Sequence, residues 1–251
     1  MNDDYSLSFI SQEDFENHVK KTIAEYNESL KAIDLRKFNS NIVDPIKLLF
    51  DKEVYRKSFD DVLTMEMQRQ RDKSNTNSIG YFHQNMFKYI ERCEVPEEGW
   101  DIVFNGDKTY YVELKNKHNT MNSSSTQKTY MRMQNQVLND NDCICALVEV
   151  IAKQSQDIKW AVSLDNTRVQ HDRIRRISID KFYQMVTGID DAFYQLCMQL
   201  PKTLKKLIDE GSVQTAEEDS AIEELREKNP DTLMALYLLA FSTYEGFSEL
   251  V

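Results

Sequence analysis

Three charged residues are spaced so that they can act together on a phosphate ester. Asp101 opens one short β-rich segment, and Glu113 and Lys115 close the next, across an asparagine-glycine turn that favours a tight hairpin. Side chains alternate along a strand, so Glu113 and Lys115 share one face while Leu114 points into the core. We expect Asp101 and Glu113 to bind magnesium, with the Leu114 carbonyl completing the metal shell. With Lys115 orienting a water, Asp101 and Glu113 would then catalyse phosphodiester hydrolysis.

A non-catalytic interpretation fits the same three residues. An aspartate, a glutamate and a lysine on an exposed hairpin also form ordinary cross-strand ion pairs, which are common and weak. Short motifs of this kind match by chance. The context favours a site, because a long amphipathic helix precedes the hairpin and a basic loop and a further helix follow it.

The basic, amide-rich stretch after Lys115 is suited to contact with DNA. Asparagine and glutamine pair with adenine, and arginine and lysine pair with guanine or phosphate. The candidate contact residues are Lys117, His118, Asn119, Asn122, Ser123, Gln127, Lys128 and Arg132. His118 fits a role in capping or bracing the loop equally well.

Accessory residues are sought on the helix before the hairpin and on a later basic segment. Gln84 and Glu91 are candidates to assist the metal site, and Glu91 also fits an exposed surface position. Arg173, Arg175 and Arg176 fit phosphate clamps and plain surface charge equally well.

The net charge of −11 argues against a nucleic-acid partner, but the distribution of the charge does not. Residues 207–251 hold eleven acidic and two basic residues, a net −9. Residues 108–132 carry a net +4 and residues 168–181 a net +3. Because distant charges are screened beyond roughly 8 to 10 Å, the basic centre can dock a polyanion; it also fits a solvated surface.

Composition limits the location of the protein. No apolar run is long enough to span a membrane, and the acidic beginning MNDDYSLS lacks the features of a signal peptide. We therefore expect a cytoplasmic protein without a membrane partner. The four cysteines show neither paired CxxC spacing nor a disulfide framework, so they are interpreted as core thiols.

The first third of the chain is predicted to be helical. Ser11 with Asp14 forms a capping-box pattern, Asp44-Pro45 begins a second helix, and Ser58 caps a third. The polar run 71–77 is predicted to break the pattern, with a new helix from Ser78 to near Cys93.

The centre of the chain then alternates between strands and helices. Strands are predicted at 100–104, 109–114, 143–151 and 158–164, and helices at 123–138, opened by serine caps, and at 179–186. The chain after Gly188 is predicted to be helical, with breaks at Pro201 and Pro230. This order predicts an α/β protein, a mixed sheet flanked by helices.

The chain is expected to form one domain over residues 1–251. Within it we distinguish a helical N-terminal region at 1–73, a catalytic core at 78–188 and an acidic helical C-terminal region at 189–251. The length is sufficient for a single large core.

Four runs carry a resemblance to a known family: IGYFHQNMF, GWDIV, VELKNKHNTMNSSS and DRIRRISIDKFYQMVTG. They resemble type II restriction endonucleases of the PD-(D/E)XK superfamily, in particular the subfamily that cuts interrupted GG…CC palindromes, GGNCC or GGWCC. The similarity covers roughly residues 79–188. One departure is Trp100, which precedes Asp101 where the superfamily's name has proline; many members tolerate this change.

The resemblance implies a restriction-endonuclease-like PD-(D/E)XK core with helical N- and C-terminal extensions. It also implies magnesium-dependent cleavage of double-stranded DNA by a homodimer, within a restriction-modification system that includes a methyltransferase of matching specificity.

Two other interpretations stay open at the level of sequence. One is a structure-specific repair or junction-resolving nuclease with the same core. The other is a non-enzymatic acidic interaction protein whose hairpin carries only a surface ion pair.

Overall fold

The structure is a computed structural model that describes residues 5–164 and 166–244. The chain divides into two compact units: unit 1 comprises Met1–Thr22 and Ser78–Ser212, and unit 2 comprises Ile23–Asn77 and Val213–Val251. Each unit is described by itself. The expected single domain over residues 1–251, with its three regions, stays a prediction.

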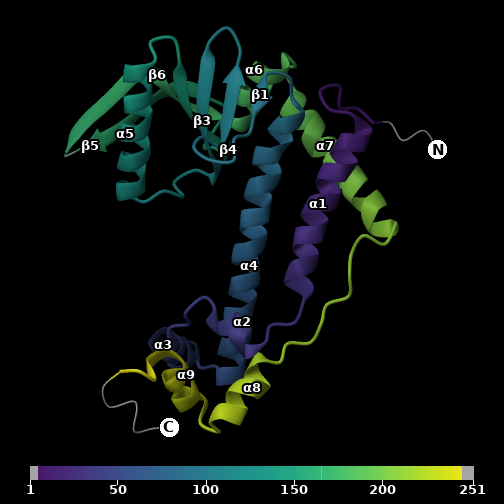
Figure 1. Cartoon of the computed structure of the whole chain (residues 1–251), viewed down its shortest axis with the longest axis vertical. Helices are drawn as coiled ribbons and strands as arrows, with labels where there is room; N and C mark the ends of the chain where they lie inside the picture. Colours follow the sequence, from purple (N-terminus) through teal and green to yellow (C-terminus); the bar gives the residue numbers. More distant parts are fainter. Residues whose placement is uncertain (1–4, 165, 245–251) are drawn as a thin grey trace. The chain divides into compact units, whose positions relative to one another are not determined.

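Unit 1 is built on a six-stranded sheet in the order β1-β2-β3-β4-β6-β5 (Figure 1). The strands are β1 (Cys93–Glu94), β2 (Ile102–Asn105), β3 (Thr109–Lys117), β4 (Ile144–Ile151), β5 (Asp157–Leu164) and β6 (Thr167–Ser178). The antiparallel pairs are β1–β2, β2–β3 and β5–β6, whereas β4 runs parallel to both β3 and β6. The predicted mixed sheet is therefore confirmed.

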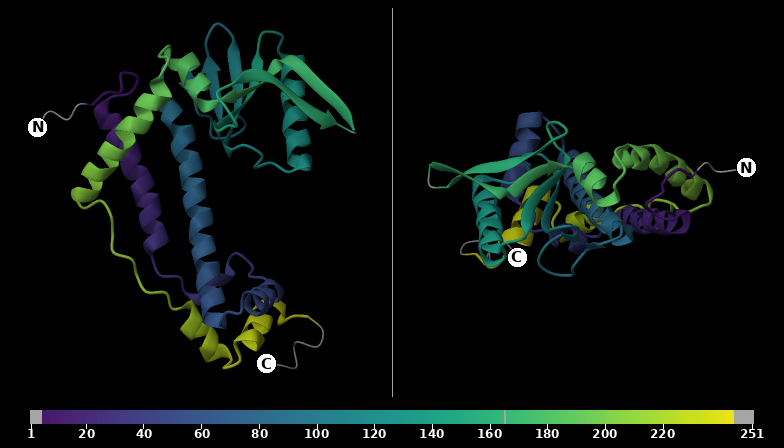
Figure 2. Two further views of the ribbon diagram at one scale, coloured as in Figure 1. Left: turned by 180° about the vertical axis from the view of Figure 1, so that it is seen from behind. Right: turned by 90° about the horizontal axis from the view of Figure 1, so that it is seen from above.

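Helices cover the sheet because its central strand is apolar on both faces. In β4, residues 145–149 are all buried, as predicted for a strand with two covered faces. Helix α5 (Ser123–Asn139) lies along one face of the sheet (Figure 2). Its Tyr130 and Met133 share a core with Cys145, Leu147 and Trp160.

Further helices of unit 1 follow the sheet. They are η1 (Phe87–Tyr89), α6 (Ile179–Thr187) and α7 (Ala192–Asp209). The Phe87 ring packs at a tilt against the rings of Phe182 and Tyr183 of α6, with centroids 5.1 and 4.9 Å away. Gly188 ends α6 in the left-handed conformation at φ 71°, close to the predicted end.

Two long helices contribute residues to both units. They are α1 (Gln12–Leu30) and α4 (Phe59–Met86). Unit 2 also contains α2 (Leu35–Asn39), α3 (Pro45–Tyr55), α8 (Ala221–Lys228) and α9 (Thr232–Phe241). Their shared core includes Phe38, Leu48, Leu63, Leu225 and Leu236.

The predicted helix starts are confirmed by their caps. Asp14 N donates to Ser11 Oγ at 3.1 Å, and the Asp44 carboxylate accepts from Ile46 N before α3. Ser58 Oγ accepts from Asp61 N at 3.1 Å at the start of α4.

The predicted break over residues 71–77 is wrong, because α4 runs without interruption from Phe59 to Met86. The segment contains no proline or glycine, so its polar side chains cover solvent-facing turns of a continuous helix. Within unit 2, Arg71 supports this stretch by binding the Ser29 carbonyl at 2.7 Å and the carboxylate of Asp219.

Two other predictions about elements need correction, and one strand was missed. Pro201 does not end a helix but lies inside α7, whereas the break at Pro230 between α8 and α9 is confirmed. Helix α5 is capped by Asn122, whose Oδ1 accepts from Ser125 N at 2.8 Å, and not by a serine. The longest strand, β6, was not predicted, because its charged residues obscure the alternation of a partly exposed strand.

Candidate active site

Asp101 is held against β3 by two backbone contacts. Its N–H donates to the Val112 carbonyl at 3.0 Å, and its carboxylate Oδ2 accepts from Leu114 N at 2.7 Å. These bonds lie just before the β2–β3 pairing of Ile102 with Val112, so the hairpin register brings Asp101 beside Glu113. The predicted convergence of these two acids is therefore present.

Burial makes Asp101 an unusual carboxylate. The pKa of Asp101 is raised above its ordinary value, first by burial and then by the nearby charge of Glu113. The hydrogen bond from Leu114 N and the charge of Lys115 oppose this effect. A group of this kind gains from a cation placed beside it, because the cation stabilises its charged form.

Glu113 lies between two cations on the face of the sheet that α5 covers. Its Oε1 is 2.7 Å from Lys115 Nζ, and its Oε2 is 3.3 Å from Arg132 Nη1. Leu114 is buried on the opposite face, which confirms the predicted alternation. Glu113 is only 15% exposed, so these are not the loose surface pairs of the non-catalytic interpretation.

Arg132 is anchored by an aromatic ring. Its guanidinium carbon lies 3.8 Å from the centroid of the Trp100 ring, within the distance of a cation–π contact. Trp100 immediately precedes Asp101, so the ring fixes a cation next to both acids.

Gln84 of α4 reaches the site through the backbone. Its Nε2 donates to the Asp101 carbonyl at 3.1 Å, which places it as a support of the strand end. Glu91 does not lie on the preceding helix as expected, because α4 ends at Met86 and a turn follows η1; it is exposed there.

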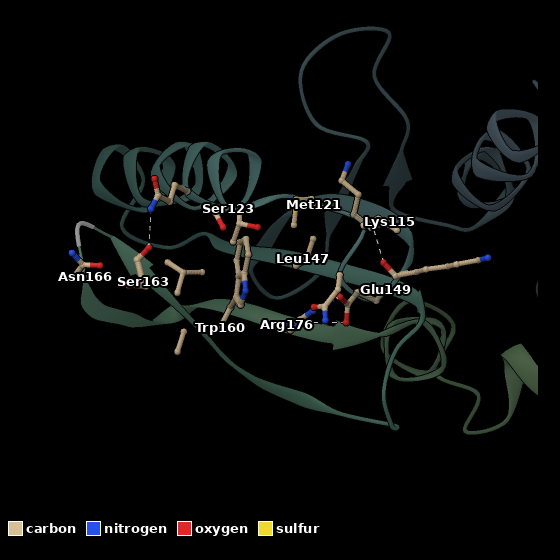
Figure 3. Close-up of a pocket in the computed structure, with 16 residues that line it drawn as sticks. Lys115, Met121, Ser123, Leu147, Glu149, Trp160, Ser163, Asn166 and Arg176 are labelled. Atoms are coloured by element: carbon tan, nitrogen blue, oxygen red, sulfur yellow. Dashed lines mark hydrogen bonds and ion pairs between the residues drawn. The ribbon is translucent and has the colours of Figure 1, made fainter. Parts of the chain in front are cut away.

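The predicted DNA-contact residues separate into distinct groups. Lys117, Asn119, Ser123 and Gln127 line one cavity of about 600 Å³ (Figure 3). Arg132 joins Glu113 instead, and Asn122 is occupied as the cap of α5. Lys128 is exposed on α5 and does not line this cavity.

His118 belongs to a charged cluster that the sequence did not reveal. Its Nδ1 lies 2.6 Å from Arg176 Nη2 and 3.2 Å from Glu149 Oε2. Glu149 and Arg176 both line the cavity, and Glu149 is buried at 1% exposure. A signal was present in the sequence: Glu149 is the only charged residue in the apolar run 143–151, and a buried acid requires a partner.

The donor set at the hairpin consists of oxygen atoms. Among the residues that the structure describes, no group of three histidine, cysteine or acidic side chains is gathered for a metal. Two carboxylates and a backbone carbonyl are nevertheless a set of the type that magnesium accepts, since it keeps several waters. The Leu114 N–H and carbonyl point to the same side of the strand, towards Asp101.

No helix in the described ranges is both long enough and apolar enough to cross a bilayer.

Comparison with known proteins places the chain among DNA-cleaving enzymes. The model of the Eco47II restriction endonuclease family matches residues 7–209. The type II restriction enzyme Sau96I of Staphylococcus aureus is 36% identical over 212 residues, which cover 81% of this chain and 81% of that enzyme. The type II restriction enzyme Eco47II of Escherichia coli is 25% identical over 214 residues, covering 81% of this chain and 89% of that enzyme.

Proposed function

Since this chain belongs to the Eco47II restriction endonuclease family and is a type II restriction endonuclease, we propose that it cleaves double-stranded DNA at a GGNCC or GGWCC site with magnesium as cofactor. Its mixed sheet flanked by helices is the restriction-endonuclease-like PD-(D/E)XK fold that the sequence predicted. Family membership overturns the interpretation as a non-enzymatic interaction protein. It also favours a restriction enzyme over a repair or junction-resolving nuclease.

One observation carries the assignment of the catalytic residues. The carboxylate of Asp101 bonds to Leu114 N at 2.7 Å, between Glu113 and Lys115, whose side chains are themselves 2.7 Å apart. Three groups that hydrolysis requires are thus gathered at the end of one hairpin.

Asp101, Glu113 and the Leu114 carbonyl are proposed to hold magnesium. When bound, the ion would neutralise charge on the phosphate and lower the pKa of a coordinated water. Asp101 Oδ2 is occupied by Leu114 N, which orients the carboxylate and leaves Oδ1 for this role.

Lys115 is proposed to orient the attacking water. Its Nζ is held by Glu113 at 2.7 Å, so the ammonium lies where it can bind a water and a phosphate oxygen. The water oxygen attacks phosphorus and releases a proton to solvent, the bond from phosphorus to the 3′ oxygen breaks, and this oxygen takes a proton from solvent, so the products are a 5′-phosphate and a 3′-hydroxyl. Gln84 serves as a positioning residue through the Asp101 carbonyl.

The residues of the cavity are proposed to contact DNA beside the cleaved bond. Lys117, Asn119, Ser123 and Gln127 line it, and each carries a donor that can reach phosphate or base edges. Lys128 and Arg132 extend the cationic surface of α5, while His118 and Asn122 support the loop that joins β3 to this helix.

A palindromic site implies a symmetric enzyme. We propose a homodimer in which each subunit cuts one strand, because protein symmetry then mirrors site symmetry. A methyltransferase of matching specificity would protect the same sites, and both enzymes would act in the cytoplasm, where the DNA lies.

A plasmid digest tests the proposal. With magnesium, the purified enzyme is expected to give discrete fragments whose sizes map to GGNCC or GGWCC sites. Asp101→Ala and Lys115→Ala are expected to lower the cleavage rate by about 10³-fold or more, because they remove a metal ligand and the water-orienting cation. Binding of a duplex should be largely retained.

The hairpin turn supplies matched controls. Asp107→Asn and Lys108→Ala change an exposed acid and an exposed base between the same two strands, and should leave cleavage unchanged. A smear or an intact plasmid from the unmodified enzyme would contradict the proposed activity, and full cleavage by either active-site variant would contradict the residue assignment.

A further inference from the structure

A row of charged side chains crosses three neighbouring strands beside the proposed metal site. Lys115 of β3 is the register partner of Glu149 of β4, and Leu147 of β4 is the partner of Arg176 of β6. Lys115, Glu149 and Arg176 all line the cavity, where Arg176 points at Glu149 (Figure 3).

Glu149 is an ionised acid in a buried position. Burial acts to raise the pKa of Glu149, but the hydrogen bonds from Arg176 and the nearby His118 outweigh it, and the pKa lies below its ordinary value. Arg176 binds both carboxylate oxygens, Nε to Oε2 at 3.0 Å and Nη2 to Oε1. A bidentate pair of this kind fixes the guanidinium in one plane.

The contact with His118 occupies the remaining hydrogen of Arg176 Nη2. Arginine can only donate, so His118 Nδ1 is the acceptor at 2.6 Å. Every hydrogen on Arg176 Nε and Nη2 is then engaged in a hydrogen bond. Nη1, with two N–H groups, has no bonding partner within residues 5–164 and 166–244.

We propose that Arg176 Nη1 binds a phosphate of the DNA backbone next to the cleaved bond, and that buried Glu149 is the positioning residue that aims it. This inference rests on the proposed DNA cleavage and adds a contact to it. Phosphate is favoured over a base because bidentate reading of guanine requires two free nitrogens, and Arg176 has only one. Lys115 and Lys117 on the same cavity wall extend the positive surface.

The neighbouring arginines of β6 are used differently. Arg173 binds the backbone carbonyls of Val137 and Asp140 at 2.6 and 2.7 Å, so it ties the end of α5 to the sheet. Arg175 pairs with Asp157 at 2.9 Å and alternates to the opposite face from Arg176. Arg175 is therefore the matched control.

The experiment measures duplex binding as a function of salt. A labelled duplex containing GGNCC is titrated in EDTA at several potassium chloride concentrations, and the same is done with a duplex lacking the site. For Arg176→Gln we expect the slope of log affinity against log salt to fall by about 0.9, the value for one phosphate contact, on both duplexes. Affinity at about 0.1 M salt should fall roughly tenfold, as that slope implies.

A double variant keeps the test valid if Arg176→Gln alone does not fold, since it leaves Glu149 buried without its partner. Glu149→Gln with Arg176→Gln restores neutrality and keeps the net charge of the native chain, so its expected loss of slope cannot come from net charge. Arg175→Gln should keep the native slope. Thermal unfolding checks that each variant is folded.

The outcomes separate the inference from the function on which it rests. Native slope and affinity in the folded variants would overturn the phosphate contact, as would a loss confined to the duplex with the site, which would indicate base reading. If the unmodified enzyme cuts no duplex with magnesium, the proposed function fails, whatever the Arg176 variants show.

Discussion

Single residues of this protein were predictable where sequence spacing alone brings them together. Asp101 and Glu113 converge because one hairpin joins them, and a hairpin is a local structure with a strong turn signal. Glu149 and Arg176 meet only because β4 and β6 run side by side, and no local pattern predicts that pairing. The proposed catalytic triplet of Asp101, Glu113 and Lys115 was therefore visible in the sequence, and the cluster of His118, Glu149 and Arg176 beside it was not.

His83 shows the same limit, because its surroundings come from two helices. Its Nδ1 is buried and has no hydrogen-bond partner in the described part of the chain. Burial first, and then the nearby His18, lower the pKa of His83 to about 4. A histidine that must stay neutral when folded favours unfolding once it is protonated.

We expect acid sensitivity from His83, with a definite sign. Its folded pKa lies below its unfolded value, so its contribution to stability is complete above about pH 6.5 and is lost as pH falls towards 4. The loss is at most about 3 kcal/mol. His83→Asn, which cannot titrate, should lose less unfolding free energy than the native protein between pH 7 and pH 4.5, measured by urea denaturation at each pH. Parallel curves for the two proteins would refute this account.

Elements were predicted well where their boundaries are marked by capping or turn residues. The caps at Ser11, Asp44 and Ser58 and the hairpin turn identify structures whose geometry requires those residue types. No capping or turn residue in the sequence identifies the polar turns of α4 as helix or the charged strand β6 as strand. Their structure is decided by packing within the folded chain, which a single sequence does not display.

The interior of α4 offers a stabilising substitution at Gly80. Glycine weakens a helix interior, and a methyl group at this position would meet Asn116 Nδ2 at 3.4 Å, an ordinary contact. Gly80→Ala should raise the free energy of unfolding by about 0.5 to 1 kcal/mol, measured by urea denaturation.

Gly188 is the contrasting control for that substitution. It has φ +71°, so Gly188→Ala adds a side chain where the backbone disfavours one and should destabilise by about 1 kcal/mol, although no atom lies within 4 Å. A lower free energy of unfolding in Gly80→Ala would contradict the prediction and would show that the Asn116 side chain cannot move to accommodate the methyl group.

At the scale of the whole molecule, acidity and DNA binding are compatible because charge is unevenly divided. Unit 1, which carries the proposed active site, holds nineteen basic and twenty-three acidic residues, whereas unit 2 holds twelve and nineteen. The larger share of the −11 net charge thus belongs to unit 2. The total net charge argued for poor binding to DNA, but most of the net negative charge lies in unit 2, away in sequence from the residues proposed to bind DNA, so this argument no longer holds.

The proposed dimer has a measurable mass and a measurable product. Light scattering should give about twice the chain mass of 29.5 kDa at micromolar concentration. Mixed dimers of native and Asp101→Ala subunits should nick one strand of a supercoiled plasmid, because only one subunit can cut. A mass equal to one chain during active cleavage would contradict the dimer.

The alternation along β3 also constrains how the gene can change. Val112 and Leu114 are buried in the core, while Glu113 and Lys115, which alternate with them, face the proposed catalytic site. Packing and chemistry are therefore encoded in neighbouring codons, with no neutral position between them. Inserting or deleting one codon here would reverse the face of every residue that follows in the strand. The turn before this strand can change in length, whereas within the strand both the number of residues and the type of each residue are constrained.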